Sequence, residues 1–188
     1  MATQEQVDEL KSKMAEERAN LIAAARALSH EDALRVPVDA EGEEQWTALE
    51  QLSHLWEMER NYDTWVLKAL REDSPDLTGI TGAPVSIPVE KANESSVDEL
   101  LARLEVERAY TFGIIDAMSL DAFDRTARSP IFGELTVLQW LRSFYRHDRQ
   151  HAAQVEGRKS EYQPTFLGGQ EPNQRKARLA PVRQQETP

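Results

Sequence analysis

Two histidines near the end of the chain have the spacing of a metal-ligand pair. His147 and His151 lie four residues apart in a segment whose apolar period predicts a helix, so both imidazoles fall on one face, about one turn apart. Four histidines placed at random in this chain would give some pair at this spacing about one time in sixteen. Taken alone, the pair also fits two surface or partly buried histidines that bond to neighbouring groups.

A third histidine occupies a matching position on an earlier predicted helix. Two stripes repeat the same steps of four, three and four residues: Trp140, Phe144, His147 and His151 in one segment, and His54, Met58, Asn61 and Trp65 in the other. Each stripe lies along the apolar face of its helix or at its margin, so both can line one cleft. Three imidazoles from two helices would fill three coordination positions and leave one for water or substrate, as catalytic sites do.

The composition restricts which other residues could take part. The chain has no cysteine, so it has neither a disulfide nor a thiolate ligand, and a metal ion must be held by histidine or carboxylate. Asp148 and Glu50 are candidates to accept the second N–H of a ligating imidazole, although a solvated helix-face charge is the commoner role for these residue types. His30 falls at the expected end of the first helix, where the helix dipole favours a cation, and we interpret it as structural.

Four amphipathic segments must position the histidines. Apolar residues recur at helical spacing in each segment, and each begins at a Ser or Thr followed three residues later by Glu or Gln, which is the pattern of a capping box. The expected helices cover 4–28, 48 to the break at 73–75, 97–118, and 137 to a stop near 157, with caps at Thr3, Thr47, Ser96 and Thr136. Pro37 and the acidic run 39–44 fall in the first connection. Residues 74–94 form a long second connection that can cross a bundle end, and 119–135 are irregular.

This pattern predicts an all-α protein, a four-helix bundle in which each apolar stripe is buried against another helix. We expect one bundle domain over 1–157 and a polar, mobile tail over 158–188. The net charge is −11, which disfavours nucleic acid as a partner, although the tail carries six Lys or Arg against three Asp or Glu. No apolar run is long enough to cross a bilayer and no secretion signal opens the chain, so we expect a cytoplasmic protein without a membrane partner.

Two stretches of this sequence resemble DinB/YfiT-like proteins: residues 46–55, with Trp46, Thr47 and His54, and residues 147–154, with the H-x-x-x-H pair of His147 and His151. The lead-in at 132–136 is similar as well. The resemblance implies a four-helix bundle with a long second connection and a divalent metal ion, often nickel or zinc, held by these three histidines. It also implies frequent dimerisation, so a homodimer is one expected assembly.

The resemblance leaves three functions open. The first is a metal-dependent small-thiol S-transferase, in which the metal holds a low-molecular-weight thiol cosubstrate and Trp140, Phe144 and Trp65 shape an apolar pocket for a small-molecule substrate. A metal-activated water would give a hydrolase instead. The third is a noncatalytic stress-response module that binds a ligand or acts as a scaffold. Imidazole ligands accept zinc, nickel, copper or iron, so the residues alone do not select the metal.

Overall fold

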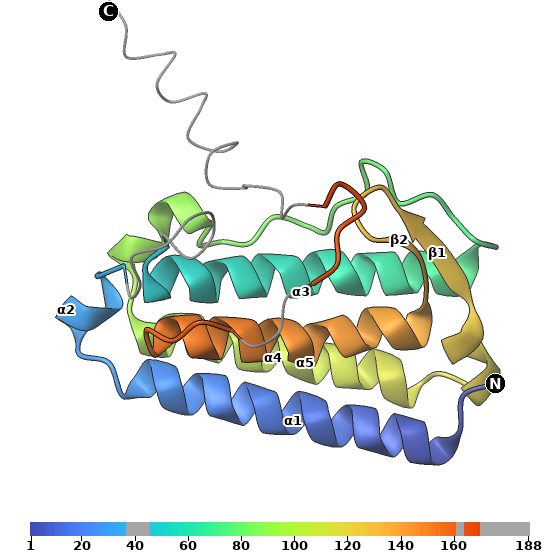
Figure 1. Ribbon diagram of the computed structural model, residues 1–188, viewed down its shortest axis with the longest axis horizontal. Coiled ribbons are helices and arrows are strands. Elements are labelled where there is room, and N and C mark those ends of the chain that lie inside the picture. Colours follow the sequence, from blue (N-terminus) through green and yellow to red (C-terminus); the bar gives the residue numbers. More distant parts are fainter. Residues whose placement is uncertain (37–45, 161–163, 170–188) are drawn as a thin grey trace, which may run out of the picture.

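Four long helices make up most of the protein (Figure 1). The computed structural model describes residues 1–36, 46–160 and 164–169. The long helices are α1 (Gln4–Arg26), α3 (Ala48–Arg71), α4 (Val97–Asp116) and α5 (Val137–Val155). The predicted four-helix architecture is therefore confirmed.

The four predicted caps begin the four long helices. Thr3, Thr47 and Thr136 each accept a hydrogen bond from the backbone N–H three residues on, and the Glu or Gln at that position returns a bond to the cap backbone. At Ser96 the structure shows the first of these bonds, from the amide of Glu99. Each bond satisfies one of the helix N–H groups that has no partner within the helix, which is why the helices start where they do.

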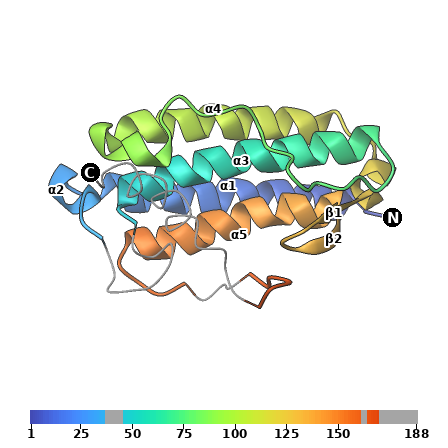
Figure 2. The same ribbon diagram turned by 90° about the horizontal axis from the view of Figure 1, so that it is seen from above.

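The order of helices around the bundle differs from their order along the chain. α1 packs against α5 and α4, and α3 packs against α4 and α5, so α1 and α3 lie on one diagonal. α1 and α5 run in one direction, while α3 and α4 run in the other (Figures 1 and 2). The parallel pair α3 and α4 requires a connection that returns along the whole bundle. The sequence indicated a long connection that can cross a bundle end, and the structure shows that it runs along the bundle (Figure 1).

The second connection follows the length of α3 (Figure 1). It contains a 3-10 helix, η2 (Val89–Glu94), which packs against α3. Several hydrogen bonds hold the connection to α3. Among them, the Ser53 hydroxyl donates to the carbonyl oxygen of Ile87 at 2.7 Å, and the Trp65 indole donates to that of Ile80 at 2.8 Å. Backbone carbonyls near the bundle core are thereby satisfied by side chains of α3.

We expected His30 to fall at the end of the first helix, and it does not. α1 ends at Arg26, and Ser29 caps a separate one-turn helix, α2 (His30–Ala33), of which His30 is the first residue. The Ser29 hydroxyl accepts the amide of Asp32 at 3.1 Å, and this local bond competes with continuation of α1. His30 is exposed and lies outside the group formed by the other three histidines.

The irregular segment before α5 contains a hairpin that the sequence did not predict. A 3-10 helix, η3 (Leu120–Asp124), leads into β1 (Thr126–Ser129), which pairs antiparallel with β2 (Gly133–Thr136). Gly133 has a φ of +81°, which a residue without a Cβ adopts readily at the end of a three-residue hairpin loop. Strands of four residues are too short for an alternating pattern to stand out, which explains the omission.

A layer of charge divides the core into two apolar clusters. One cluster holds Val7, Leu10, Met14 and four aromatic residues of α3 and α5, namely Tyr62, Trp65, Trp140 and Phe144; the other holds Leu21, Leu52 and Leu104. Between them, Arg18, Glu59, Arg108 and Asp148 are each at most 5% exposed, one from each long helix. Two positive and two negative charges meet there, so the layer is neutral as a whole.

The guanidinium groups bridge both carboxylates of this charged layer. Arg18 donates to Glu59 at 2.6 Å and to both oxygens of Asp148 at 2.9 and 3.1 Å. Arg108 donates to both oxygens of Glu59 at 2.6 and 3.2 Å and to Asp148 at 3.0 Å. The pKa of Glu59 falls to about 2, because the nearby Arg108 and Arg18 outweigh the effect of burial, which alone would raise it.

Nine residues of the expected tail are described, 158–160 and 164–169, and the second group contacts the hairpin segment. The Leu167 amide donates to the carbonyl oxygen of Ile131 at 2.8 Å, and the Phe166 ring lies 5.3 Å from that of Phe132. The remaining tail from 170, residues 161–163, and the first connection with Pro37 and the acidic run lie outside the described residues. The division at 157 stays a prediction. Among the described helices, none is long and apolar enough to cross a membrane.

Candidate metal centre

The three histidines singled out by their spacing meet between α3 and α5. His54 comes from the second turn of α3, and His147 and His151 from the second half of α5. One ring nitrogen from each residue can be chosen so that all three lie within 4.8 Å of one another. The Nε2 atoms of His147 and His151 are 3.0 Å apart. These three residues form the histidine cluster.

Helix direction explains why residues almost a hundred positions apart meet. α3 and α5 are antiparallel neighbours, so the start of α3 lies beside the end of α5 (Figures 1 and 2). The cap at Thr47 fixes the residue at which α3 begins. The i, i+4 spacing in α5 places two imidazoles on one face of that helix, toward α3. His54 and His151 are almost fully buried and His147 is half-buried, which leaves the cluster one partly accessible side.

Aromatic rings surround the cluster. The Trp46 ring packs edge-on against His54 at 4.7 Å between ring centres, and the Tyr62 ring lies 6.1 Å from His147 and 5.3 Å from Phe144. Such a surrounding excludes water from the imidazoles and lowers the local dielectric.

The three aromatic residues expected to shape an apolar pocket are buried in the hydrophobic core. Trp140, Phe144 and Trp65 have exposed fractions of 0%, 2% and 7%. Trp65 and Trp140 pack against each other at 5.1 Å. The helical stripe was correctly placed on the inner face, where these rings pack between the helices.

Gln51 is the neighbour of the cluster that the sequence interpretation missed. Its side-chain oxygen lies 3.1 Å from Nδ1 of His151, and its side-chain nitrogen donates to the carbonyl oxygen of Trp46 at 3.2 Å. Gln51 is completely buried and stands three residues before His54, on the same face of α3. That spacing was a usable signal of a hydrogen-bond partner for the cluster, but the candidates named from the sequence were carboxylates.

Neither carboxylate candidate is a solvated surface charge. Asp148 is 1% exposed and bound by Arg18 and Arg108 in the charged layer. Glu50 is also buried, and its carboxylate accepts the Thr47 amide at 2.9 Å as part of the capping box. The commoner role was therefore wrong for both. Their hydrogen bonds show a helix cap and an ion pair in its place.

Burial keeps the two α5 imidazoles neutral. It lowers the pKa of His147 to about 4; nearby Asp148 acts to raise this pKa and nearby Arg18 to lower it. Burial, with His147 beside it, also lowers the pKa of His151 well below its ordinary value, while the Gln154 side chain acts in the opposite direction. Neutral imidazole is the form that ligates a metal ion, so near pH 7 these side chains are ready to act as ligands.

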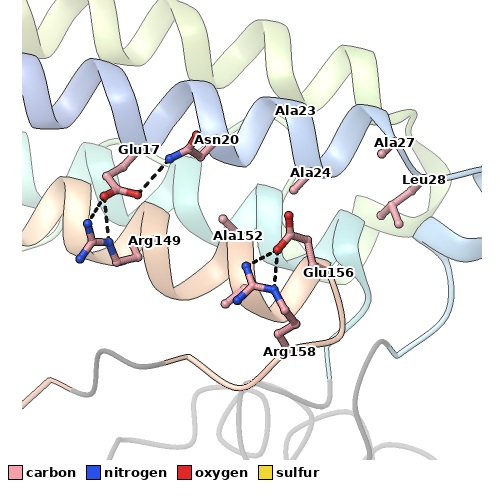
Figure 3. A pocket seen from close by; sticks show the side chains of 11 residues that line it. Glu17, Asn20, Ala23, Ala24, Ala27, Leu28, Arg149, Ala152, Glu156 and Arg158 are labelled. Carbon is pink, nitrogen blue, oxygen red and sulfur yellow. Dashed lines mark hydrogen bonds and ion pairs between the residues drawn. The ribbon is translucent and has the colours of Figure 1, made fainter.

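A surface groove lies on a different face of α5. It has a volume of about 740 Å³ and runs between α1 and α5, over Ala23, Ala24, Ala27 and Ala152 (Figure 3). Ion pairs join Glu17 to Arg149 and Glu156 to Arg158 along it. None of the three histidines lines this groove, so we do not place the site there.

The family model of the DinB superfamily matches residues 13–155, which include all three histidines and all four residues of the charged layer. The chain belongs to the DinB superfamily. The uncharacterized protein YuaE of Bacillus subtilis (strain 168) is 26% identical over 128 residues, covering 60% of this chain and 76% of that protein.

A solved structure supports the same fold. YfiT from Bacillus subtilis superimposes with a TM-score of 0.65 and 17% identity, covering 82% of this chain and 86% of that one. YfiT is described as a probable metal-dependent hydrolase with an unusual four-helix bundle topology. At this identity the likeness establishes the fold alone.

Proposed function

We propose that this DinB protein binds one divalent metal ion through His54, His147 and His151 and uses it to activate a small nucleophile. The observation that carries the proposal is the convergence of three imidazole nitrogens within 4.8 Å, two of them 3.0 Å apart. Tetrahedral ligation at ordinary zinc–nitrogen lengths places donor atoms roughly 3.3 Å apart, close to the shorter distance. Three neutral nitrogen donors suit zinc or nickel and leave a further position for an exogenous group.

A bound ion would keep its charge among neutral imidazoles and lower the pKa of a thiol or water placed on it. The chain's own residues contribute position and surroundings. The rings of Trp46 and Tyr62 exclude solvent, and half-buried His147 lies on the accessible side. The chain has no cysteine, so a thiol nucleophile would come from a cosubstrate.

A small thiol is the nucleophile that this site supports best. Water has a pKa of about 15.7 and zinc hydrolases commonly add a carboxylate base, whereas a thiol ionises near 8.5 and needs less help. The carboxylate next to His147 is Asp148, and the arginines of the charged layer already occupy both its oxygens. Asp148 is therefore a poor general base for a water molecule. Transfer of a low-molecular-weight thiol to a small electrophile is the activity we propose first.

Metal-dependent hydrolysis is the second candidate. Its support is the structural likeness to YfiT, whose description as a probable metal-dependent hydrolase concerns that protein. A noncatalytic ligand-binding or scaffold role would use the same ion without turnover.

Metal content tests the site first. Tag-free full-length protein should hold about one equivalent of zinc or nickel after incubation, and the triple variant His54→Ala, His147→Ala, His151→Ala should hold none. His30→Ala is the matched control, because His30 is exposed and outside the cluster, and it should keep the metal. Equal metal content in the triple variant and the wild type would overturn the proposed site.

Turnover then separates the three functions. Metal-loaded wild type and the triple variant are assayed against electrophiles with several small thiols, and against esters and amides without thiol. Thiol consumption that depends on the cluster supports the transferase, and cluster-dependent ester or amide cleavage supports the hydrolase. Ligand binding without either reaction would refute both enzymatic functions.

A further inference from the structure

The orientation of the Gln51 amide is fixed by a group that can only accept hydrogen bonds. The carbonyl oxygen of Trp46 lies 3.2 Å from the Gln51 side-chain nitrogen, so the NH₂ end must face Trp46. The amide oxygen is thereby turned to Nδ1 of His151, at 3.1 Å. An amide oxygen has no hydrogen, so this contact is a hydrogen bond only if Nδ1 of His151 carries the proton.

A neutral imidazole with its proton on Nδ1 has its lone pair on Nε2. That atom faces Nε2 of His147 at 3.0 Å, inside the histidine cluster. His151 and Gln51 are both 0% exposed, so water does not compete for either ring nitrogen. Leaving the Nδ1–H unpaired in this setting would carry the full cost of an unsatisfied buried donor.

We infer that Gln51 is a positioning residue that fixes His151 in the Nδ1-protonated tautomer and directs its Nε2 lone pair into the cluster. The inference rests on the proposed function, because the lone pair becomes useful as a metal ligand. A partner on the far nitrogen of a ligating histidine commonly raises metal affinity by about ten- to a hundredfold. Here the partner is a neutral amide, so it orients the ring without adding negative charge to the site.

Removing the amide reverses the tautomer. In Gln51→Leu, which places an apolar side chain of similar size there, a proton on Nδ1 would lose the Gln51 oxygen as its acceptor. A proton on Nε2 could still donate to Nε2 of His147 at 3.0 Å. His151 therefore moves its proton to Nε2, and the lone pair turns away from the cluster. Gln51→Glu restores an acceptor for Nδ1 and recovers the wild-type tautomer, at the expense of the bond to Trp46.

Nitrogen NMR of the metal-free protein measures the tautomer directly. Two-bond proton–nitrogen correlations of full-length protein labelled with nitrogen-15 should show His151 protonated on Nδ1 in the wild type and in Gln51→Glu, and on Nε2 in Gln51→Leu. Gln150→Leu is the matched control, because Gln150 is a second buried amide on α5 for which the structure shows no hydrogen bond to His151. It should leave the tautomer unchanged. Circular dichroism verifies that each variant is folded.

Zinc titration of the same proteins gives the second readout. Gln51→Leu should bind zinc about ten- to a hundredfold more weakly than wild type, and Gln150→Leu within a factor of about three. A wild-type tautomer in Gln51→Leu, or a tautomer change in Gln150→Leu alone, overturns the role of Gln51. If the wild type binds neither zinc nor nickel, the proposed function fails, whereas a tautomer change in metal-free Gln51→Leu still supports Gln51 as the residue that orients His151.

Discussion

Asp63 should make the protein less stable as the pH rises, which is the reverse of the usual behaviour of a carboxylate. It lies beside the charged layer, is 3% exposed, and has one carboxylate oxygen without a hydrogen-bond partner among the described residues. Its other oxygen is 3.0 Å from the hydroxyl of Thr111, which also lies 3.0 Å from a Glu59 oxygen. A hydroxyl has one hydrogen, so it cannot donate to both carboxylates at once. A proton on Asp63 resolves this conflict by donating to Thr111.

The pKa of Asp63 agrees with this geometry. Burial raises it to about 8, with nearby Glu59 and Glu107 adding to the rise and Thr111 and Arg108 opposing it. An unfolded aspartate ionises near 3.9, so between about pH 4 and pH 8 the folded protein holds one proton more than the unfolded chain. The free energy of unfolding that Asp63 contributes is therefore full below about pH 4. It falls by at most about 1.4 kcal/mol per pH unit up to about pH 8, roughly 5 kcal/mol in all.

Asp63→Asn isolates this contribution, because an amide mimics the protonated acid and cannot ionise. Urea unfolding of the wild type and the variant is followed by tryptophan fluorescence from about pH 4 to pH 9, with a chelator present to exclude metal. Other titrating groups are common to both proteins and cancel in the difference. The wild type should lose stability relative to the variant as the pH rises, with a plateau above about pH 8. A difference in stability between the two proteins that is independent of pH would refute the raised pKa of Asp63.

Five further substitutions test how the bundle is held together. Arg108→Met leaves the buried carboxylates of the charged layer without one of their two arginines and should lower the free energy of unfolding in urea by about 3–5 kcal/mol. Arg149→Met, at the half-exposed ion pair with Glu17, should lower it by at most about 1 kcal/mol. Similar losses in the two variants would contradict the special role of the layer. Gly82→Ala places a Cβ 2.7 Å from a carbonyl oxygen of α3 and should lower the melting temperature, whereas Gly113→Ala, with open space around it in α4, should raise stability by up to about 1 kcal/mol. Thr136→Ala removes the cap of α5 and should cost about 1 kcal/mol, so no measurable loss would show the cap to be dispensable.

Local patterns were sufficient for the helices and the cluster. The caps at Thr3, Thr47 and Thr136 are set by bonds over three residues, so the sequence contains everything needed to place them. The same holds for the shared face of His147 and His151. The approach of His54 to that pair depends on which helices are neighbours. The equal spacing of the two stripes predicted this, and the structure bears it out.

Features that leave no helical period in the sequence were missed. The hairpin at 126–136 consists of two strands of four residues, and the end of α1 is decided by one local bond at Ser29. Gln51 was overlooked because its importance lies in two partners, one five residues back and one a hundred residues on. Neither pairing leaves a period in the sequence.

The charged layer shows how a buried charge could be recognised from sequence. A charged residue on one helix is most simply explained as solvated, which is how Asp148 was interpreted. Each of the four members, however, stands four residues after an apolar core residue, and the pairs are Met14 and Arg18, Leu55 and Glu59, Leu104 and Arg108, and Phe144 and Asp148. Four such replacements, one on each helix and with signs that sum to zero, are hard to reconcile with solvated faces. They favour one buried layer in which every charge has a partner.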